Sequence, residues 1–189
     1  MPRVANTLLA AALLALPVLA HAAPAPRANP VVHGAVELSP AVSFNHENLK
    51  RDGYGGVDNF TQLDFTPTIG YCITNHYEVT GGMLIQHQSQ NGSSATAVGA
   101  LAGVTYNFNP SGSLVPFAGL GFGNMFDGGF SFDQPAVILP NLTAGLRVLA
   151  GGSSSVNLTL GYQRERNDSM RQNRILAGVG VSVFPWGVR

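Results

Sequence analysis

Apolar and polar side chains alternate along much of the chain after residue 31. Segment 156–163 reads Val-Asn-Leu-Thr-Leu-Gly-Tyr-Gln, and segments 98–108, 141–148 and 175–183 repeat this pattern. A period of two places successive side chains on opposite faces of a β-strand. The pattern therefore predicts strands that have one apolar face and one face of small or polar residues.

Eight such strands are expected between turn signals. They span residues 32–46, 59–73, 76–88, 94–108, 113–126, 135–150, 154–165 and 173–185. Short connections at Asn75, 109–112 and 151–153 alternate with longer polar connections at 47–58, 89–93, 127–134 and 166–172. This order predicts an up-and-down antiparallel meander, with short turns at one end and long loops at the other.

Two all-β architectures share this alternation, a transmembrane β-barrel and a soluble lipocalin-like barrel. The polar face distinguishes them, because a solvated exterior carries abundant mixed charge. Here that face has few charges, Glu37, Asp64, Glu78 and Arg147, among many Gly, Thr, Ser and Asn, and only 11% of the chain is charged. A narrow lumen suits such side chains. An eight-stranded antiparallel transmembrane β-barrel is therefore favoured over the soluble barrel.

Aromatic residues stand near both ends of the predicted strands, as the two interfacial girdles of a membrane barrel do. The group near the short turns comprises Tyr71, Tyr77, Tyr106, Phe108 and Trp186. The group near the long loops comprises Phe44, Phe60, Phe122 and Phe126.

The N-terminal segment carries the pattern of a secretory signal peptide. Arg3 supplies a positive charge, residues 8–19 form an apolar run, and Ala20-His21-Ala22 matches a small-x-small cleavage site. The domain organisation expected is a signal peptide at 1–22, a short periplasmic tail at 23–30 and a barrel at 31–189. The three prolines of the tail disfavour a helix there.

Segment 116–123 reads Pro-Phe-Ala-Gly-Leu-Gly-Phe-Gly, and the last strand includes Ala-Gly-Val-Gly-Val-Ser-Val-Phe at 177–184. Together they resemble the small OmpA/OmpX-type outer-membrane barrels of Gram-negative bacteria. The resemblance implies a barrel in the cell outer membrane with its N-terminus in the periplasm, in contact with membrane lipid and lipopolysaccharide. Such barrels commonly end on an aromatic residue, whereas this chain continues beyond Phe184 with Pro-Trp-Gly-Val-Arg.

Glu37, Glu78 and Arg147 fall on the polar face, in the half of the barrel nearest the short turns. Unpaired charges are costly in a confined interior. Arg147 is therefore expected to form lumen ion pairs with one or both glutamates. An ion path is the functional alternative, although eight strands usually enclose a space that side chains fill.

His87 and Ser89 share one face of the third predicted strand and could pair an imidazole with a hydroxyl nucleophile. Outer-membrane lipid A deacylases carry a His-x-Ser on the strand before the last long loop, where this chain reads Tyr-Gln-Arg-Glu-Arg at 162–166. No acidic residue is evident at the adjoining end of the fourth strand to orient the imidazole. The pair is interpreted as polar rim residues, and no catalytic residue is assigned.

No cofactor or metal site is predicted. Gly119, Gly121 and Gly123 lack the GxGxxG spacing of a dinucleotide loop. His33 and Glu37 lie about 13 Å apart along an extended strand, too far to share one ion. The lone cysteine, Cys72, has no partner in the chain for a disulfide.

The densest charge cluster lies at residues 163–174. It holds Arg164, Arg166, Arg171 and Arg174 against Glu165 and Asp168. Guanidinium groups form two parallel hydrogen bonds with phosphate or sulfate, so these arginines are a candidate anion-binding loop. A solvated loop that only prevents edge aggregation is the alternative.

A non-catalytic outer-membrane protein with a structural or surface-interaction role is the function expected, with loops that meet lipopolysaccharide or host ligands. A lipid A-modifying enzyme that uses His87 and Ser89, and a narrow pore, are the alternatives. Ten basic residues balance ten acidic residues, which argues against nucleic acid as a partner. A monomer is expected.

Overall fold

The computed structural model describes residues 31–50, 57–90, 92–126, 136–150, 152–166 and 171–185. The predicted signal peptide and periplasmic tail lie outside these ranges. In the part of the chain that the structure describes, no helix is long and apolar enough to cross a membrane.

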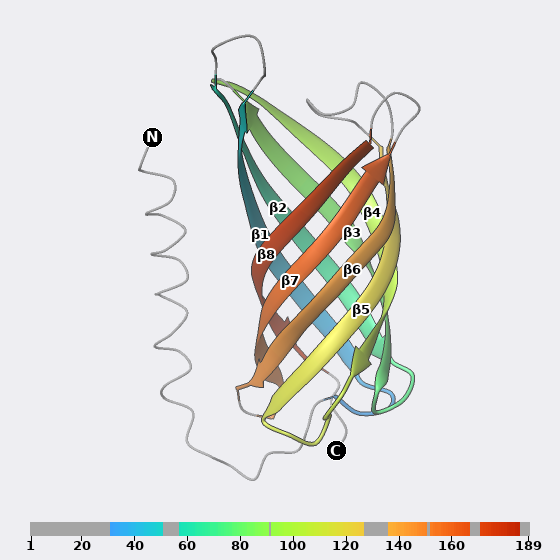
Figure 1. Cartoon of the computed structure of the whole chain (residues 1–189). Coiled ribbons are helices and arrows are strands. Elements are labelled where there is room, and N and C mark those ends of the chain that lie inside the picture. The colour runs from blue at the N-terminus through green and yellow to red at the C-terminus, as the bar shows by residue number, and fades with distance from the viewer. Residues whose placement is uncertain are drawn as a thin grey trace.

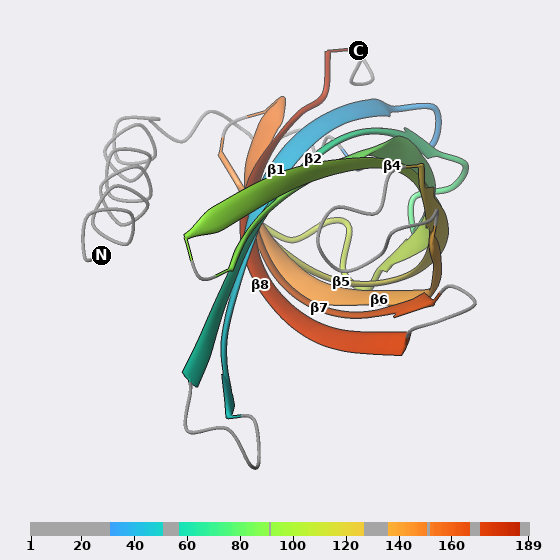
Figure 2. The same cartoon turned by 90° about the horizontal axis from the view of Figure 1, so that it is seen from above.

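Eight antiparallel strands form one closed barrel in meander order, and β1 pairs with β8 to complete the ring (Figures 1 and 2). This confirms the predicted fold class. The strands are β1 (Val36–Lys50), β2 (Val57–Cys72), β3 (Tyr77–Gln90), β4 (Ser93–Asn107), β5 (Leu114–Met125), β6 (Ala136–Leu149), β7 (Ser154–Arg166) and β8 (Arg171–Val183).

The barrel has two distinct ends, named here the base and the rim. The base carries the connections 73–76, 108–113 and 150–153, together with both ends of the described chain. The rim carries the connections between β1 and β2, β3 and β4, β5 and β6, and β7 and β8. Figure 1 shows the base at the bottom and the rim at the top.

The predicted contrast between short turns and long loops is wrong for two rim connections. Pairing of β3 with β4 continues to Gln90 and Ser93, and the connection between them contains Gly92, whose φ of 87° favours glycine. Pairing of β7 with β8 likewise continues to Arg166 and Arg171. The polar residues assigned to loops therefore extend the strands, because backbone pairing continues beyond the apolar pattern.

The first strand begins four residues later than expected, at Val36 instead of residue 32. Residues 31–35 instead turn beneath the barrel, where Gly34 N donates a hydrogen bond to Cys72 O (2.8 Å). Gly34 has a φ of 84°, a conformation that disfavours other residues.

The exterior of the barrel is apolar and its interior is polar. Ile175, Ile69 and Leu160 point outward with 60% or more of their surface exposed. Gln62 and Glu165 point inward and are fully buried. A soluble barrel requires the opposite arrangement, so the side-chain distribution contradicts the lipocalin-like alternative.

A register shift in β6 changes which residues face the lumen. The pairing with β7 slips between Ile138 and Asn141. Ala136 and Ile138 are therefore buried on one side of the slip, whereas Arg147 and Leu149 are buried on the other. The inward-facing positions of β6 thus change from even-numbered to odd-numbered residues at this slip, as a β-bulge requires.

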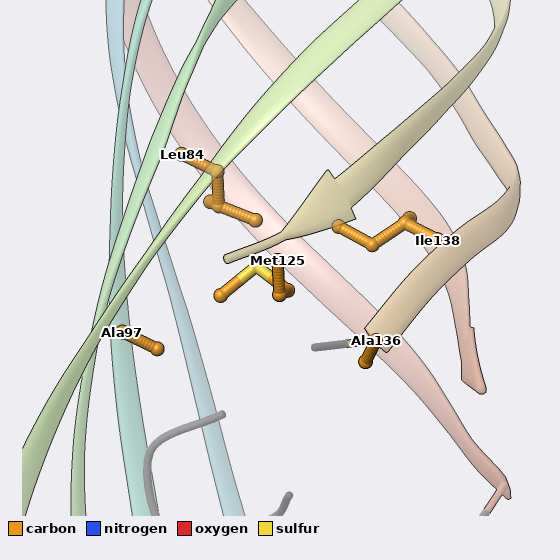
Figure 3. Packing of buried hydrophobic residues seen from close by; sticks show 5 residues of the cluster. All are labelled: Leu84, Ala97, Met125, Ala136 and Ile138. Atoms are coloured by element: carbon orange, nitrogen blue, oxygen red, sulfur yellow. The ribbon is translucent and has the colours of Figure 1, made fainter. Parts of the chain in front are cut away.

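Two apolar clusters occupy the lumen at different heights. The first contains Leu84, Ala97, Met125, Ala136 and Ile138, whose side chains come from the consecutive strands β3 to β6 and meet inside the barrel (Figure 3). The second lies at the base and contains Val31, Ala35, Cys72 and Phe184. The interior is therefore partly filled by packing at both levels, as eight strands allow.

Candidate functional site: the charged lumen

The base half of the lumen holds Glu37 of β1, Glu78 of β3 and Arg147 of β6. Arg147 Nη2 lies 2.9 Å from Glu37 Oε2 and 3.4 Å from Glu78 Oε2. All three side chains are at least 95% buried. The three charged residues singled out from the alternation thus meet across the barrel, and this cluster is named the base layer.

Neighbouring groups hold the base layer in place. The Arg147 guanidinium lies 5.6 Å from the centre of the Phe117 ring and 5.7 Å from that of Phe184. Ser182 donates a hydrogen bond to Glu37 Oε1. Gly70 gives the Glu78 carboxylate its space, because a Cβ atom there would overlap Glu78 Oε1. Cation–π contacts and hydrogen bonds therefore support the desolvated ion pairs.

A second charged cluster, the rim layer, lies in the other half of the lumen. Arg174 Nη1 donates to Glu165 Oε1 at 2.7 Å, and both side chains are completely buried. Buried glutamines and one buried aspartate surround this pair and complete the cluster. Its members are Gln62, Asp64, Gln86, Gln88, Gln163, Glu165 and Arg174.

The amides of the rim layer donate to its carboxylates. Gln163 Nε2 donates to Glu165 Oε1 at 2.7 Å, and Gln62 Nε2 donates to Asp64 Oδ1 at 2.7 Å. Gln88 Nε2 donates to Gln86 Oε1 at 2.6 Å. Gln86 Nε2 also donates to Glu165 Oε1 at 3.4 Å, and Gln86 is hydrogen-bonded to Asp64 as well. The layer is thus a connected polar network, the kind of arrangement that makes buried charge tolerable.

The candidate anion-binding loop requires correction, because Arg174 is not at the surface. It lies inside the lumen, 1% exposed, with Glu165 as its partner. Arg166 is exposed and Arg164 is half-buried, both on the alternate positions of β7 that face outward. Arg171 lies opposite Arg166 in the β7–β8 register, and its side chain is outside the described residues.

Sequence reasoning missed the rim layer as a site, although the signal was present. Ile175, Ala177 and Val179 mark the outward face of β8, so Arg174 falls on the inward face by the same alternation. Glu165 likewise alternates with outward Arg164 and Arg166. The predicted strands 154–165 and 173–185 include Glu165 and Arg174, but their charge grouped them with the neighbouring loop as an anion-binding cluster, and the face that each occupies was not taken from the alternation.

A cavity of about 180 Å³, lined by both polar and apolar side chains, adjoins the base layer. Its wall includes Arg147, Asn141 and Asn157, and threonines from several strands: Thr66, Thr68, Thr80, Thr105, Thr143 and Thr159. Several water molecules would fit this volume, at roughly 30 Å³ for each.

The His87 imidazole does not use Ser89 as its partner in this structure. His87 Nδ1 lies 3.0 Å from Thr96 Oγ1 of the adjacent strand, and the histidine is exposed on the outer face of the barrel. Among the described residues, no three His, Cys, Asp or Glu side chains gather to form a metal site.

Three of the aromatic residues predicted near the base form a continuous group with His76. The Tyr106 ring lies 5.0 Å from each of the Tyr77 and Phe108 rings, and stacks 5.5 Å from His76. Near the rim, Phe44, Phe122 and Phe126 are exposed as expected: their exposed fractions are 39%, 60% and 60%.

The prediction for Phe60 is wrong, because this ring points inward and is 5% exposed. It lies 5.9 Å from the Arg174 guanidinium, inside the lumen. Trp186 lies outside the described residues.

Comparison with protein-family models and with curated proteins finds no match. Comparison with solved structures finds similar barrels. Neisserial surface protein A is 14% identical with a TM-score of 0.57, and the N-terminal β-barrel domain of Pseudomonas aeruginosa OprF is 18% identical with a TM-score of 0.54. Each alignment covers 80% of this chain and 97% of the other. The chain therefore has the fold of the small OmpA/OmpX-type outer-membrane barrels.

Proposed function

We propose that this chain is a non-catalytic, integral outer-membrane protein with a structural or surface-interaction role. The observation that carries this proposal is the inverted polarity of the barrel, whose exposed surface is rich in Leu, Ile, Val and Phe while its carboxylates and guanidinium groups are buried. In water such an apolar exterior would drive association. In a bilayer the same surface contacts lipid. Where all eight strands pair in a ring, no strand edge leaves its backbone groups unpaired in the hydrocarbon.

The dimensions of the strands fit a bilayer. The shortest strand, β5, has 12 residues, which at about 3.3 Å per residue gives a length of about 40 Å. A tilt of about 40° reduces its height to about 30 Å. This height exceeds the apolar band of about 25 Å that outer-membrane barrels present to lipid.

The rim offers surface for interactions, and we place it on the outer side, with the base and the N-terminus in the periplasm. The β1–β2 pairing continues to Lys50 and Val57, whereas the β1–β8 pairing ends at Phe44 and Ala177. Residues 45–50 therefore project about 20 Å beyond that point, at about 3.4 Å per residue. Figure 1 shows this hairpin at the top of the barrel, above the rim ends of β7 and β8.

Lipopolysaccharide is the partner that the corrected arginine group supports. Arg164 and Arg166 face outward near the rim, and Arg171 is paired opposite Arg166. Lipid phosphates lie at this level of the outer leaflet in the proposed orientation. Exposed guanidinium–phosphate contacts contribute about 1 kcal/mol each and weaken with salt.

The test is binding of purified barrel to lipopolysaccharide vesicles at low and high salt. A triple alanine variant of Arg164, Arg166 and Arg171 is expected to bind more weakly at low salt and to lose most of the salt dependence. A triple lysine variant is the matched control, because it keeps the charge and loses the planar fork. Equal, salt-insensitive binding by the wild type and the alanine variant would reject this surface as the lipopolysaccharide site.

The narrow-pore alternative has in its favour the cavity beside the base layer, whose wall includes charged and hydroxyl side chains. The base layer and the rim layer both lie across the lumen, so ion flow would require side chains of both layers to move. Planar bilayer conductance measures this directly. Steady channel openings by the wild-type barrel would favour the pore over the closed structural role.

A further inference from the structure

Three buried polar atoms of the base layer make no hydrogen bond with the described residues. Two are donors of the Arg147 guanidinium, Nε and Nη1. The third is the acceptor Glu37 Oε2, which is ion-paired with Arg147 Nη2 at 2.9 Å. Both side chains are at least 95% buried. Unpaired polar atoms at such depth are unfavourable, and buried polar groups are normally completed by protein or by ordered water.

The two residues that carry these atoms border one common space. Arg147 and Glu37 both line the cavity of about 180 Å³. Leu101 also lines it and packs against the first apolar cluster, so the cavity lies between that cluster and the base layer. A molecule bound in the cavity therefore contacts both partners of the Arg147–Glu37 ion pair.

A belt of threonines from five strands continues the polar lining around the cavity. Its members are Thr68, Thr80, Thr105, Thr143 and Thr159. Each stands opposite a glycine of a neighbouring strand. A Cβ atom at Gly119 would lie 2.6 Å from Thr143 Oγ1, so the glycine lets this hydroxyl lie against the wall. The centre of the lumen stays open at this level, within reach of groups that donate one hydrogen bond and accept two.

The polarity of the unpaired atoms selects a neutral ligand. The unused N–H groups of Arg147 repel a cation, whereas the carboxylates of Glu37 and Glu78 repel an anion. Water carries no charge and supplies both donors and acceptors, and a buried water typically makes about three hydrogen bonds. At roughly 30 Å³ for each molecule, a volume of about 180 Å³ holds about six waters.

We propose that this cavity is a water-binding site, in which about six ordered waters complete the hydrogen bonds of Arg147 Nε and Nη1 and of Glu37 Oε2. The same waters link the base layer to the threonine belt. A bridging water is nearly as favourable in enthalpy as a direct hydrogen bond, so the cluster solvates the ion pairs inside the lumen. This internal site is separate from the surface role proposed above, because it needs no partner outside the barrel.

The first test is a crystal structure of the wild-type mature barrel at a resolution that shows ordered water. Water peaks are expected within hydrogen-bond distance of Arg147 Nε and Nη1. A second crystal is pressurised with xenon, which enters dry apolar cavities, and no xenon peak is expected here. Xenon in the cavity, or density for one larger molecule, overturns the proposal.

The second test counts internal waters by magnetic relaxation dispersion of the solvent, with the barrel in detergent micelles. Ala41→Ile adds carbon atoms to a residue that lines the cavity. This variant is expected to displace about two of the six waters and to lower the wild-type amplitude by up to about one third. Ala144→Ile is the matched control, because Ala144 is exposed on the outer face of β6, and it is expected to keep the full amplitude.

Equal amplitudes in Ala41→Ile and Ala144→Ile would show that long-lived waters do not occupy the cavity, and would overturn the proposal. The crystal experiment uses the wild-type chain alone. It therefore gives a decisive result even if Ala41→Ile does not fold.

Discussion

Replacing Arg147 by methionine tests the base layer most directly. The guanidinium group lies between Glu37 and Glu78, at 2.9 Å and 3.4 Å from their nearest oxygens. Methionine keeps an unbranched apolar stem of similar length and removes the charge. The variant therefore leaves two carboxylates in a desolvated site without their counter-ion.

The magnitude follows from the burial of this layer. Removal of one partner from a buried ion pair costs about 3–5 kcal/mol. Loss of the cation–π contacts with Phe117 and Phe184 adds about 1–2 kcal/mol. A total of about 5 kcal/mol is expected, which is a large part of the stability of a typical domain.

The assay is equilibrium unfolding in urea after refolding into short-chain lipid vesicles, with the folded fraction read from the heat-dependent shift of the band on a gel. The triple variant Arg147→Met, Glu37→Gln and Glu78→Gln removes all three charges and is expected to regain at least about 2 kcal/mol. The double glutamine variant with Arg147 intact is the control. A loss below about 1 kcal/mol in Arg147→Met, or no recovery in the triple variant, would refute the pairing.

Two further predictions concern the wall of the barrel. Leu160→Arg at the middle of β7 is expected to cost about 2–4 kcal/mol, whereas Leu114→Arg at the first residue of β5 costs about 0–1 kcal/mol, because the penalty depends on depth in the bilayer. Equal losses in vesicle refolding titrations would contradict the proposed insertion. Gly145→Ala places a Cβ atom against the backbone oxygen of Leu158 and 2.6 Å from Cζ of the Phe117 ring, and it is expected to cost about 1–3 kcal/mol. Outward Gly81→Ala has open space and changes stability by less than about 0.5 kcal/mol. Urea midpoints that are indistinguishable for the two alanine variants would exclude this steric explanation.

Much of the fold could be predicted from local pattern alone. Alternation decides which face of a strand each residue occupies, because successive side chains point in opposite directions. This reasoning identified eight strands and placed Glu37, Glu78 and Arg147 on the inner face. It failed where a charged residue near the end of a strand faced inward, as at Arg174, and where an aromatic residue pointed inward, as at Phe60. In both cases residue type outweighed position in the prediction.

The tertiary structure decided which inward residues meet. Alternation gives the face of Arg147 but not its height in the barrel, because height depends on strand tilt, on register and on the slip between Ile138 and Asn141. Closure of β1 on β8 then brings Glu37, 110 positions away in the chain, within 2.9 Å of Arg147. The rim layer arises in the same way, since Gln86 of β3 reaches Glu165 of β7 (3.4 Å) only across a closed ring. The sequence thus determined the polarity of each face through local stereochemistry, whereas the charged layers depend on long-range register that no local pattern encodes.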